Sequence, residues 1–345
     1  MSTPAIDPAG GQPPTCSICI ANYNGETMLA DCLGSVFSQN PSITTEVIVH
    51  DDASTDASLA VLAGYPRVIV IASRENVGFC VANNRMVARA RGEYVLLLNN
   101  DAALDADGLH ELLEAAQAQA PKGILTLPQR DWKSGQPVDA GCLLDPFYNP
   151  VPNLRGDRRD VAMVIGACLF LPRSLWIELG GFPEWFESIG EDLYLCCLAR
   201  LRGLPVQVTA ASGYRHRQGA SFSGERAGDA LQSTFRRRSL SERNKTTVMF
   251  ICTPTWIVWP LLALHVVSLC VEGFVLLLVR RDPRIWREIY AQAIAHPFRD
   301  RANLRSARRR AQSLREISLA RYLAAFTLLP DKLRLLLRRG VPTIR

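Results

Sequence analysis

The stretch Tyr94-Val-Leu-Leu-Leu-Asn-Asn-Asp101 decides the fold. Four β-forming residues, Val95 to Leu98, lead here into a polar tip. A short apolar run bounded by turn residues predicts a strand that is buried on both faces, as in a parallel sheet. Ligands of open α/β sheets bind at the carboxyl ends of such strands, so Asp101 would reach a cleft. Two interpretations stay open: Asp101 binds a hard divalent cation, or it caps the helix expected over residues 104–118.

Strand-like and helix-like segments alternate on the N-terminal side of this stretch. The expected strands are residues 15–21, 46–50 and 67–72, and the expected helices are residues 26–38, 57–63 and 80–90. The alternation predicts βαβ units and a parallel sheet, whose loops meet at one edge. These loops contribute Asn22 and Asn24, then Asp51, Asp52 and Asp56, and then Asn99 to Asp101. The chain has neither a dinucleotide fingerprint nor a P-loop, so a divalent metal is expected to neutralise the phosphates of a nucleotide ligand.

Four motifs follow one another along the chain: Ala21-Asn-Tyr-Asn-Gly25, Asp51-Asp-Ala-Ser-Thr-Asp56, Asn76-Val-Gly-Phe79 and Leu98-Asn-Asn-Asp101. In their order and spacing the chain resembles the family 2 glycosyltransferases of GT-A fold, over about residues 15–220. The resemblance implies an α/β fold with a mixed sheet flanked by helices. It also implies a nucleotide-diphosphate sugar as donor, Mg²⁺ or Mn²⁺ as cofactor, and inversion at the anomeric carbon.

The same resemblance assigns donor-binding roles to a set of polar residues and one glycine: Asn22, Asp51, Asp52, Arg74, Asn76, Gly78, Asn84, Asn100 and Asp101. Asp51 would bind the base or ribose, and Asp101 would be the metal ligand of a DxD-type motif. The chain departs from the family at two positions. Asn99 replaces the first carboxylate of that motif, so metal binding would depend more heavily on Asp101, and Asn84-Arg-Met86 stands where the family often has Asn-x-Gly.

A pair of carboxylates, Glu191 and Asp192, begins another expected helix. Acids are favourable at a helix start, which is one interpretation of the pair. The other is catalytic, because an inverting transfer needs a carboxylate that accepts the proton of the acceptor hydroxyl. The pair resembles the ED motif of the family, which implies Asp192 as the base, with Glu191 as the alternative.

Two further residues have candidate roles in the second half of the site. His216 resembles the histidine that completes the metal shell in many family members, although a packed histidine is the alternative. Trp185 is predicted either to stack on a sugar or acceptor, or to pack in the core. Residues 121–162 are expected to form loops over the acceptor cleft, and residues 161–171 to form another strand.

Charge and hydropathy divide the chain unevenly. We expect a disordered leader over residues 1–14, which lack the apolar core of a signal peptide. Residues 15–240 would be the GT-A domain, and residues 241–345 an apolar and then Arg-rich helical region that associates with a membrane. From residue 280 to residue 345 there are 17 basic and 5 acidic residues, a net charge of +12, against +6 for the whole chain. The scattered cysteines are expected to be buried free thiols.

Residues 248–279 are apolar except for a few positions, among them Glu272. Three interpretations stay open: one spanning helix, a re-entrant hairpin, or amphipathic helices in the membrane interface. The basic flank favours contact with anionic lipids at the cytoplasmic face of the inner membrane. Binding of nucleic acid is not expected, because no aromatic stacking platform or groove-reading motif accompanies the basic tail.

Together these features predict a membrane-associated, inverting transferase that moves a single sugar to a lipid-linked or cell-surface glycan acceptor. The tail resembles that of bacterial rhamnosyltransferases of cell-surface polysaccharide assembly, which favours dTDP-rhamnose or a UDP-sugar as donor. Processive synthases usually carry a QxxRW motif, which this chain lacks. Two alternatives remain: a catalytically inactive membrane scaffold of the same fold, and a sugar nucleotidyltransferase. Members of the latter class typically have a Gly-rich basic loop where this chain has Ala21-Asn-Tyr-Asn-Gly25.

Overall fold

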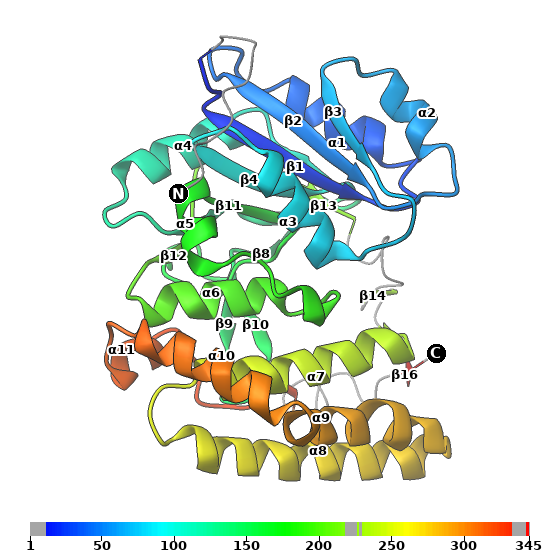
Figure 1. Cartoon of the computed structure of the whole chain (residues 1–345), viewed down its shortest axis with the longest axis vertical. Coiled ribbons are helices and arrows are strands. Elements are labelled where there is room, and N and C mark those ends of the chain that lie inside the picture. The colour runs from blue at the N-terminus through cyan, green and yellow to red at the C-terminus, as the bar shows by residue number, and fades with distance from the viewer. Residues whose placement is uncertain (1–11, 218–225, 228–229, 333–342, 345) are drawn as a thin grey trace.

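A seven-stranded mixed sheet forms the centre of the N-terminal part of the molecule (Figure 1). The chain is seen here as a computed structural model, which describes residues 12–217, 226–227, 230–332 and 343–344. The strands, in their order across the sheet, are β12 (Val206–Val208), β6 (Ile124–Thr126), β11 (Cys168–Pro172), β4 (Tyr94–Asn99), β1 (Cys16–Asn22), β2 (Thr45–Asp51) and β3 (Val68–Ala72). β1 to β4 run parallel, whereas β11 is antiparallel to both of its neighbours. The predicted mixed α/β sheet is therefore confirmed.

Helices cover both faces of this sheet. They are α1 (Leu29–Phe37), α2 (Ser58–Ala63), α3 (Phe79–Arg89), α4 (Gly108–Ala118), α5 (Arg173–Leu179) and α6 (Glu191–Leu201). Alternate residues of β4 enter two cores. Val95 and Leu97 pack with α3, α5 and α6, whereas Leu96 and Leu98 pack with α1 and α4. Burial on both faces explains the continuous apolar run at the centre of the sequence.

Several expectations for the region after β4 are wrong. The helix expected over residues 104–118 begins at Gly108, and its N-cap is Asp107 rather than Asp101. Residues 121–162 are not only loops, since they contain β6 and the short strands β7 (Gln129–Asp131), β8 (Pro137–Asp139), β9 (Cys142–Leu144) and β10 (Pro150–Pro152). The strand expected over residues 161–171 starts only at Cys168. Strands of three residues are too short to show a periodic pattern in the sequence.

A second, four-stranded sheet has the order β5-β13-β7-β8. Its first two strands are β5 (Ala102–Leu104), which directly follows Asp101, and β13 (Tyr214–His216). They pair antiparallel, with His216 opposite Ala102. This pairing carries His216, more than a hundred positions away in the chain, to the tip of the central strand β4.

The C-terminal helices form a layer beneath the sheet domain in Figure 1. They are α7 (Phe235–Cys252), α8 (Val258–Arg280), the π-helical segment η2 (Ile285–Tyr290), α9 (Ala291–Arg299), α10 (Arg301–Ser313) and α11 (Leu319–Leu323). The remaining elements are the 3₁₀ turn η1 (Glu184–Phe186) and the strands β14 (Arg226–Ala227), β15 (Ala230–Ser233) and β16 (Thr343–Ile344). α7 packs on α6 on one side and on α8 on the other (Figure 1). The predicted domain boundary between residues 240 and 241 falls inside α7.

The apolar segment 248–279 is divided between two helices. Residues 248–252 end α7 and are buried in the core that α6 also shares. Residues 253–257 connect α7 to α8, which contains residues 258–279, and by length and composition α8 is the one helix in the described part of the chain that could cross a membrane. All the cysteines are free thiols, as predicted, and all but the half-buried Cys270 are buried. Most of the expected leader, residues 1–11, lies outside the described residues.

Candidate active site

The turn after β1 is tied to the loop after β2 and to the tip of β4. Nδ2 of Asn22 donates to Oδ2 of Asp51 at 2.9 Å, and Nδ2 of Asn100 donates to Oδ1 of Asn22 at 2.8 Å. Asp51 also accepts hydrogen bonds from the backbone N–H and the hydroxyl of Ser54, a residue that the sequence analysis missed. All three predicted residues are buried. The structure therefore brings Asn22, Asp51 and Asn100 together at the carboxyl edge of the sheet, while their binding roles stay predictions.

Asp52 shapes the loop that precedes α3. Its Oδ1 accepts the N–H of Val77 at 2.7 Å, and its Oδ2 accepts the N–H of Gly78 at 2.9 Å. Gly78 has a φ of +87°, a conformation that favours glycine, so the loop needs both the residue and its carboxylate partner. Arg74 and Asn76 lie exposed on the same loop. Asp52 thus faces backbone, whereas Arg74 and Asn76 are accessible to a ligand.

The two predicted metal ligands lie side by side. Nε2 of His216 is 3.1 Å from Oδ1 of Asp101, and both side chains are buried. Nδ1 of His216 has no hydrogen-bond partner within the described residues. Among those residues no third His, Cys, Asp or Glu completes a metal-binding cluster. A carboxylate and an imidazole fit a divalent cation that takes its other ligands from phosphate oxygens and water.

The predicted carboxylate pair opens α6. Oδ2 of Asp192 accepts the N–H of Gly166 at 3.0 Å, and Oδ1 accepts the N–H of Leu193 at 2.7 Å. Glu191 is buried, and its Oε2 has no hydrogen-bond partner among the described residues. Burial, and then the charge of Asp192, raise the pKa of Glu191 to about 8, and burial also raises the pKa of Asp192. The raised pKa keeps Glu191 protonated near neutral pH, while the two N–H donors favour the negative charge on Asp192.

The backbone of residues 166–167 connects the two halves of the site. The N–H of Gly166 binds Asp192, and the carbonyl of Ala167 accepts the N–H of Asn99 at 3.1 Å. Asn99 is two residues from Asp101. The carboxylate pair of α6 and the tip of β4 therefore lie on either side of one short segment, which leads into β11.

Two predicted residues have surroundings that change their interpretation. The side-chain amide of Asn84 donates to the carbonyl of Phe182 at 2.9 Å and accepts its N–H at 3.0 Å, so it joins α3 to the 181–184 turn. Trp185 is 42% exposed and packs edge-on against Phe186, so the core interpretation does not fit. Its exposed ring is available for stacking.

The sequence analysis missed two residues of α7 that touch this site, Arg243 and Asn244. They hydrogen-bond to the turn that precedes Glu191. The signal that could have found them is the polar run 242–247 immediately before the apolar residues 248–252. Polar residues that cover every side of a helix cannot all face solvent when the helix continues into a core.

Residues 17–178 match the sequence model of the family described as Glycosyl transferase family 2. This segment is a family 2 glycosyltransferase domain. The match covers the donor-loop motifs and the Asn99-Asn-Asp101 tip, whereas Glu191, Asp192 and His216 lie beyond its C-terminal end. Geometry rather than the family match therefore brings those three residues into the site of the glycosyltransferase domain.

One curated relative with a named process is "Succinoglycan biosynthesis protein ExoO" of Rhizobium meliloti (strain 1021), which is 34% identical to the chain over 120 residues. That segment is 34% of this chain and 33% of ExoO, so the chain spans about a third of the length of this relative.

Two solved glycosyltransferase structures share the fold. S. aureus TarS 1-349 in complex with UDP-GlcNAc has a TM-score of 0.52 and 16% identity, covering 87% of this chain and 90% of that one. The mannosyltransferase PcManGT from Pyrobaculum calidifontis, in complex with GDP-Man and Mn²⁺, has a TM-score of 0.50 and 18% identity, covering 90% of this chain and 88% of that one. At these identities the likeness shows the GT-A fold alone.

Proposed function

We propose that the chain is an inverting glycosyltransferase that moves a single sugar from a nucleotide-diphosphate sugar to an acceptor hydroxyl. The observation that carries the proposal is the arrangement around residues 166–167, with the Asp192 carboxylate on one side and the tip of β4 on the other. A buried carboxylate beside a protonated acid, together with the candidate metal ligands Asp101 and His216, suits the transfer of a group away from a diphosphate.

Asp192 acts as the base in this proposal. It accepts the proton of the acceptor hydroxyl while the hydroxyl oxygen bonds to the anomeric carbon and the bond from that carbon to the diphosphate breaks on the opposite face. Inversion follows from this single displacement. The N–H groups of Gly166 and Leu193 hold the Asp192 carboxylate in place, and Glu191 stays protonated near neutral pH.

The donor diphosphate would lie near Asp101 and His216. These two residues would hold Mg²⁺ or Mn²⁺, which supplies positive charge for the departing diphosphate. Asp51 would bind the base or ribose, and the loop bearing Arg74 and Asn76 would border the nucleotide. The complexes of TarS with UDP-GlcNAc and of PcManGT with GDP-Man and Mn²⁺ support this arrangement, because the fold is shared.

The favoured donors are dTDP-rhamnose and UDP-sugars, and the favoured acceptor is a lipid-linked or cell-surface glycan. The similarity to ExoO, which is named for succinoglycan biosynthesis, supports a polysaccharide acceptor. Trp185, half exposed beside the turn that leads to Glu191, would stack on the acceptor.

We also infer that α8 lies in the surface of the cytoplasmic leaflet of the inner membrane and does not cross it. A row of large apolar side chains points outward, each between 57% and 60% exposed: Trp259, Leu264, Val267, Val271, Phe274 and Leu278. Their spacing places them on one face of the helix. The opposite face, with His265, Leu269 and Leu276, is buried against the protein. Because the inner face is packed on the protein, only the outer apolar face is left to enter lipid, as in a helix that lies in the plane of the interface.

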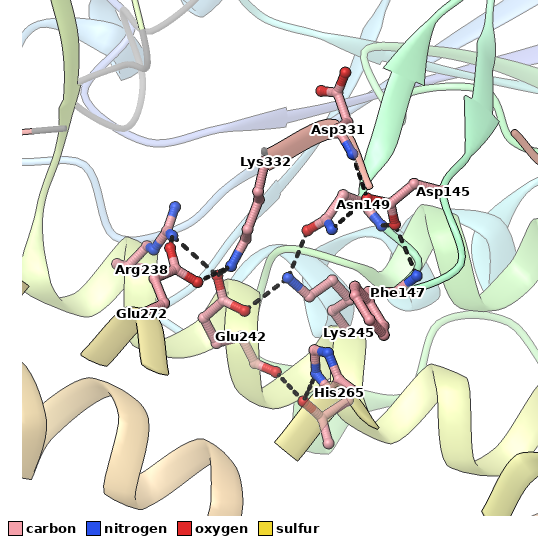
Figure 2. A network of polar contacts seen from close by, with 11 residues as sticks. Asp145, Phe147, Asn149, Arg238, Glu242, Lys245, His265, Glu272, Asp331 and Lys332 are labelled. Carbon is pink, nitrogen blue, oxygen red and sulfur yellow. Dashed lines mark hydrogen bonds and ion pairs between the residues drawn. The ribbon is translucent and has the colours of Figure 1, made fainter. Parts of the chain in front are cut away.

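A network of partly and fully buried charges connects the inner face of α8 to the rest of the protein (Figure 2). Glu272 of α8 pairs with Lys332 at 2.6 Å and with Arg238 of α7. Glu242 of α7 accepts from both Lys332 and Lys245 at 2.6 Å. Separating α8 from the rest of the protein would leave the partly buried Glu272 without its two cationic partners, which is unfavourable. α8 therefore cannot leave the domain to span a bilayer without losing these contacts, and the exposed Arg280 and Arg281 at its end suit anionic lipid headgroups.

The experiment that tests the enzymatic proposal is donor hydrolysis by the purified chain. Panels of dTDP-, UDP- and GDP-sugars are offered with Mn²⁺ or Mg²⁺, with and without EDTA, to wild type, Asp101→Ala and the control His110→Ala, which changes an exposed histidine of α4. Metal-dependent release of nucleotide from one donor, lost only in Asp101→Ala, is the expected result. No release from any donor, even with membrane extract as acceptor source, would favour a scaffold, and synthesis of a nucleotide sugar from a nucleoside triphosphate would identify a nucleotidyltransferase.

A further inference from the structure

The turn that delivers the carboxylate pair has a strained backbone. Glu187 has φ 64° and ψ −66°, and the N–H of Ser188 donates to the carbonyl of Phe186 at 2.7 Å, which together define the rarer γ-turn. Ile189 has a φ of 68°, which is unfavourable for a β-branched residue, and Gly190 has a φ of 92°. Such conformations persist only where the surrounding structure holds them, and they often occur at active sites.

A buried side chain of α7 binds the backbone of this turn. Nδ2 of Asn244, which is completely buried in α7, donates to the carbonyls of Phe186, Ser188 and Ile189 at 3.0, 3.1 and 2.8 Å. A side-chain amide has two N–H donors, so three carbonyl oxygens share both of them. Without Asn244, the three carbonyl oxygens would lose the donor that they have in common, in a buried site.

The neighbouring Arg243 orients that amide. Its Nε donates to Oδ1 of Asn244 at 2.9 Å, which leaves Nδ2 facing the turn. Its Nη2 donates to the carbonyl of Phe186 at 3.2 Å, and its Nη1 pairs with Glu187 at 3.2 Å. Both functional groups of Asn244 therefore have defined partners, and its orientation follows from them.

The held turn touches both sides of the site. Its C-terminal end is Gly190, directly before Glu191 and Asp192. The backbone carbonyl of its second residue, Glu187, accepts the N–H of Cys80 at 3.2 Å, at the start of α3 and close to Gly78 of the donor loop. A change in this turn would move the carboxylate pair relative to the donor loop.

We propose that Asn244 is a positioning residue for the proposed transfer reaction: from α7 it holds the strained 186–190 turn in the conformation that presents Asp192 to the acceptor. The inference rests on the proposed function for its catalytic consequence. It adds that α7, the helix on which the membrane-facing α8 packs, sets the geometry of the base.

The test compares Asn244→Ala and Asn244→Asp with Gln39→Ala, which removes another buried side-chain amide that donates to two carbonyls, between α1 and Asp105. Asn244→Ala is expected to lower turnover by roughly tenfold to a hundredfold, because small misplacements of reacting groups have effects of this size. The affinity for UDP, dTDP or GDP with Mn²⁺ should change by less than about threefold, since the nucleotide contacts remain. Asn244→Asp should be the more damaged variant, because a carboxylate would face three carbonyl oxygens.

Hydrogen–deuterium exchange gives a readout that needs no activity. Uptake in a peptide covering residues 184–195 should rise in Asn244→Ala and stay at the wild-type level in Gln39→Ala. Adding Ile189→Gly to Asn244→Ala should recover part of the turnover, because glycine accepts positive φ without strain.

Three outcomes would overturn the proposal. The first is wild-type turnover and exchange in Asn244→Ala. The second is a loss of turnover and nucleotide affinity together, with the same fall in melting temperature as in Gln39→Ala. The third is an increase in exchange throughout α7 rather than in the turn. If wild type releases nucleotide from no donor, the proposed function fails, while the exchange measurement still decides whether Asn244 holds the turn.

Discussion

The backbone N–H of Gly166 donates a hydrogen bond of 3.0 Å to Oδ2 of Asp192. This contact fixes the first turn of α6 against the segment that leads into β11. The carbonyl of the neighbouring Ala167 accepts the N–H of Asn99 at the tip of β4. The same segment therefore fixes the position of the carboxylate pair relative to the donor side of the site. Asp192 thus has a defined direction before any ligand arrives, as a positioned base requires.

Asp192→Asn should lower turnover about 10²- to 10⁴-fold, the range expected for loss of a positioned general base. Nucleotide affinity with Mn²⁺ should stay close to wild type, because Asp192 is separate from Asp101 and His216. Steady-state kinetics with the active donor, together with calorimetry of nucleotide binding, would measure both. Glu178→Gln, which changes an exposed partner of Arg202, is the control. A larger loss in Glu191→Gln than in Asp192→Asn would assign the base to Glu191 instead.

Glu191 should make the protein less stable as the pH rises. Its pKa is raised from 4.5 to about 8 in the folded chain, chiefly by burial. Between these two values the folded state keeps a proton that the unfolded state has lost, so the free energy of unfolding falls with increasing pH, by up to about 1.4 kcal/mol per pH unit. The contribution is fully present below pH 4.5 and lost above pH 8.

Glu191→Gln removes this titration. The variant should therefore gain stability relative to wild type as the pH is raised from 5 to roughly 8.5. Urea unfolding at several pH values would measure the difference, with Glu178→Gln expected to follow wild type throughout. A difference between Glu191→Gln and wild type that does not change with pH would show that the Glu191 carboxyl ionises at its ordinary pKa.

His216 and Asp101 should act together in metal binding, because their polar atoms are 3.1 Å apart and the β5–β13 pairing holds them there. His216→Ala should weaken Mn²⁺ binding in the presence of UDP by at least roughly tenfold, the lower end of the effect of losing even an outer-shell partner. Asp101→Asn should weaken it further. Calorimetric titration of Mn²⁺ would measure both, with the exposed His110→Ala as control. Equal Mn²⁺ affinity in wild type and His216→Ala would remove His216 from the metal site.

The sequence was sufficient for the parts of the fold that have a strong local pattern. The apolar run 95–98 and the alternation around it predicted β1 to β4 and their helices, because strands buried on both faces must be apolar throughout. Asp51, Asn100 and Asp101 followed, since the polar tips of parallel strands meet at one edge.

The remainder depends on contacts between distant segments. The strands β5 to β10 have three residues each, too few for periodicity, and the helix expected from residue 104 therefore overlapped the last residue of β5. Asn84 and Asp52 are predicted ligand contacts, and that role stays a prediction; the sequence did not show that their side chains also bind the backbone of neighbouring loops. Arg243 and Asn244 lie more than fifty positions from the turn that they hold. No pattern in the sequence around them indicates that contact.

The outward face of α8 should bind vesicles that contain anionic lipid. In flotation with phosphatidylglycerol vesicles, wild type should float, and binding should weaken in pure phosphatidylcholine and at high salt, because each basic residue near the surface contributes about 1 kcal/mol. Val267→Glu and Phe274→Glu place charges in the middle of this face and should abolish flotation. Leu59→Glu, on an exposed apolar position of α2, is the matched control and should float like wild type.

Two further measurements separate the other arrangements of α8. Alkaline carbonate should extract the chain from membranes, since the ion pairs of Glu272 with Arg238 and Lys332 keep the inner face of the helix on the protein. Resistance to carbonate would instead indicate a spanning helix, and a breakdown of the α7–α8 contact. A dimer in solution that dissociates on Val267→Glu would show that a second copy of the chain, rather than lipid, covers this face.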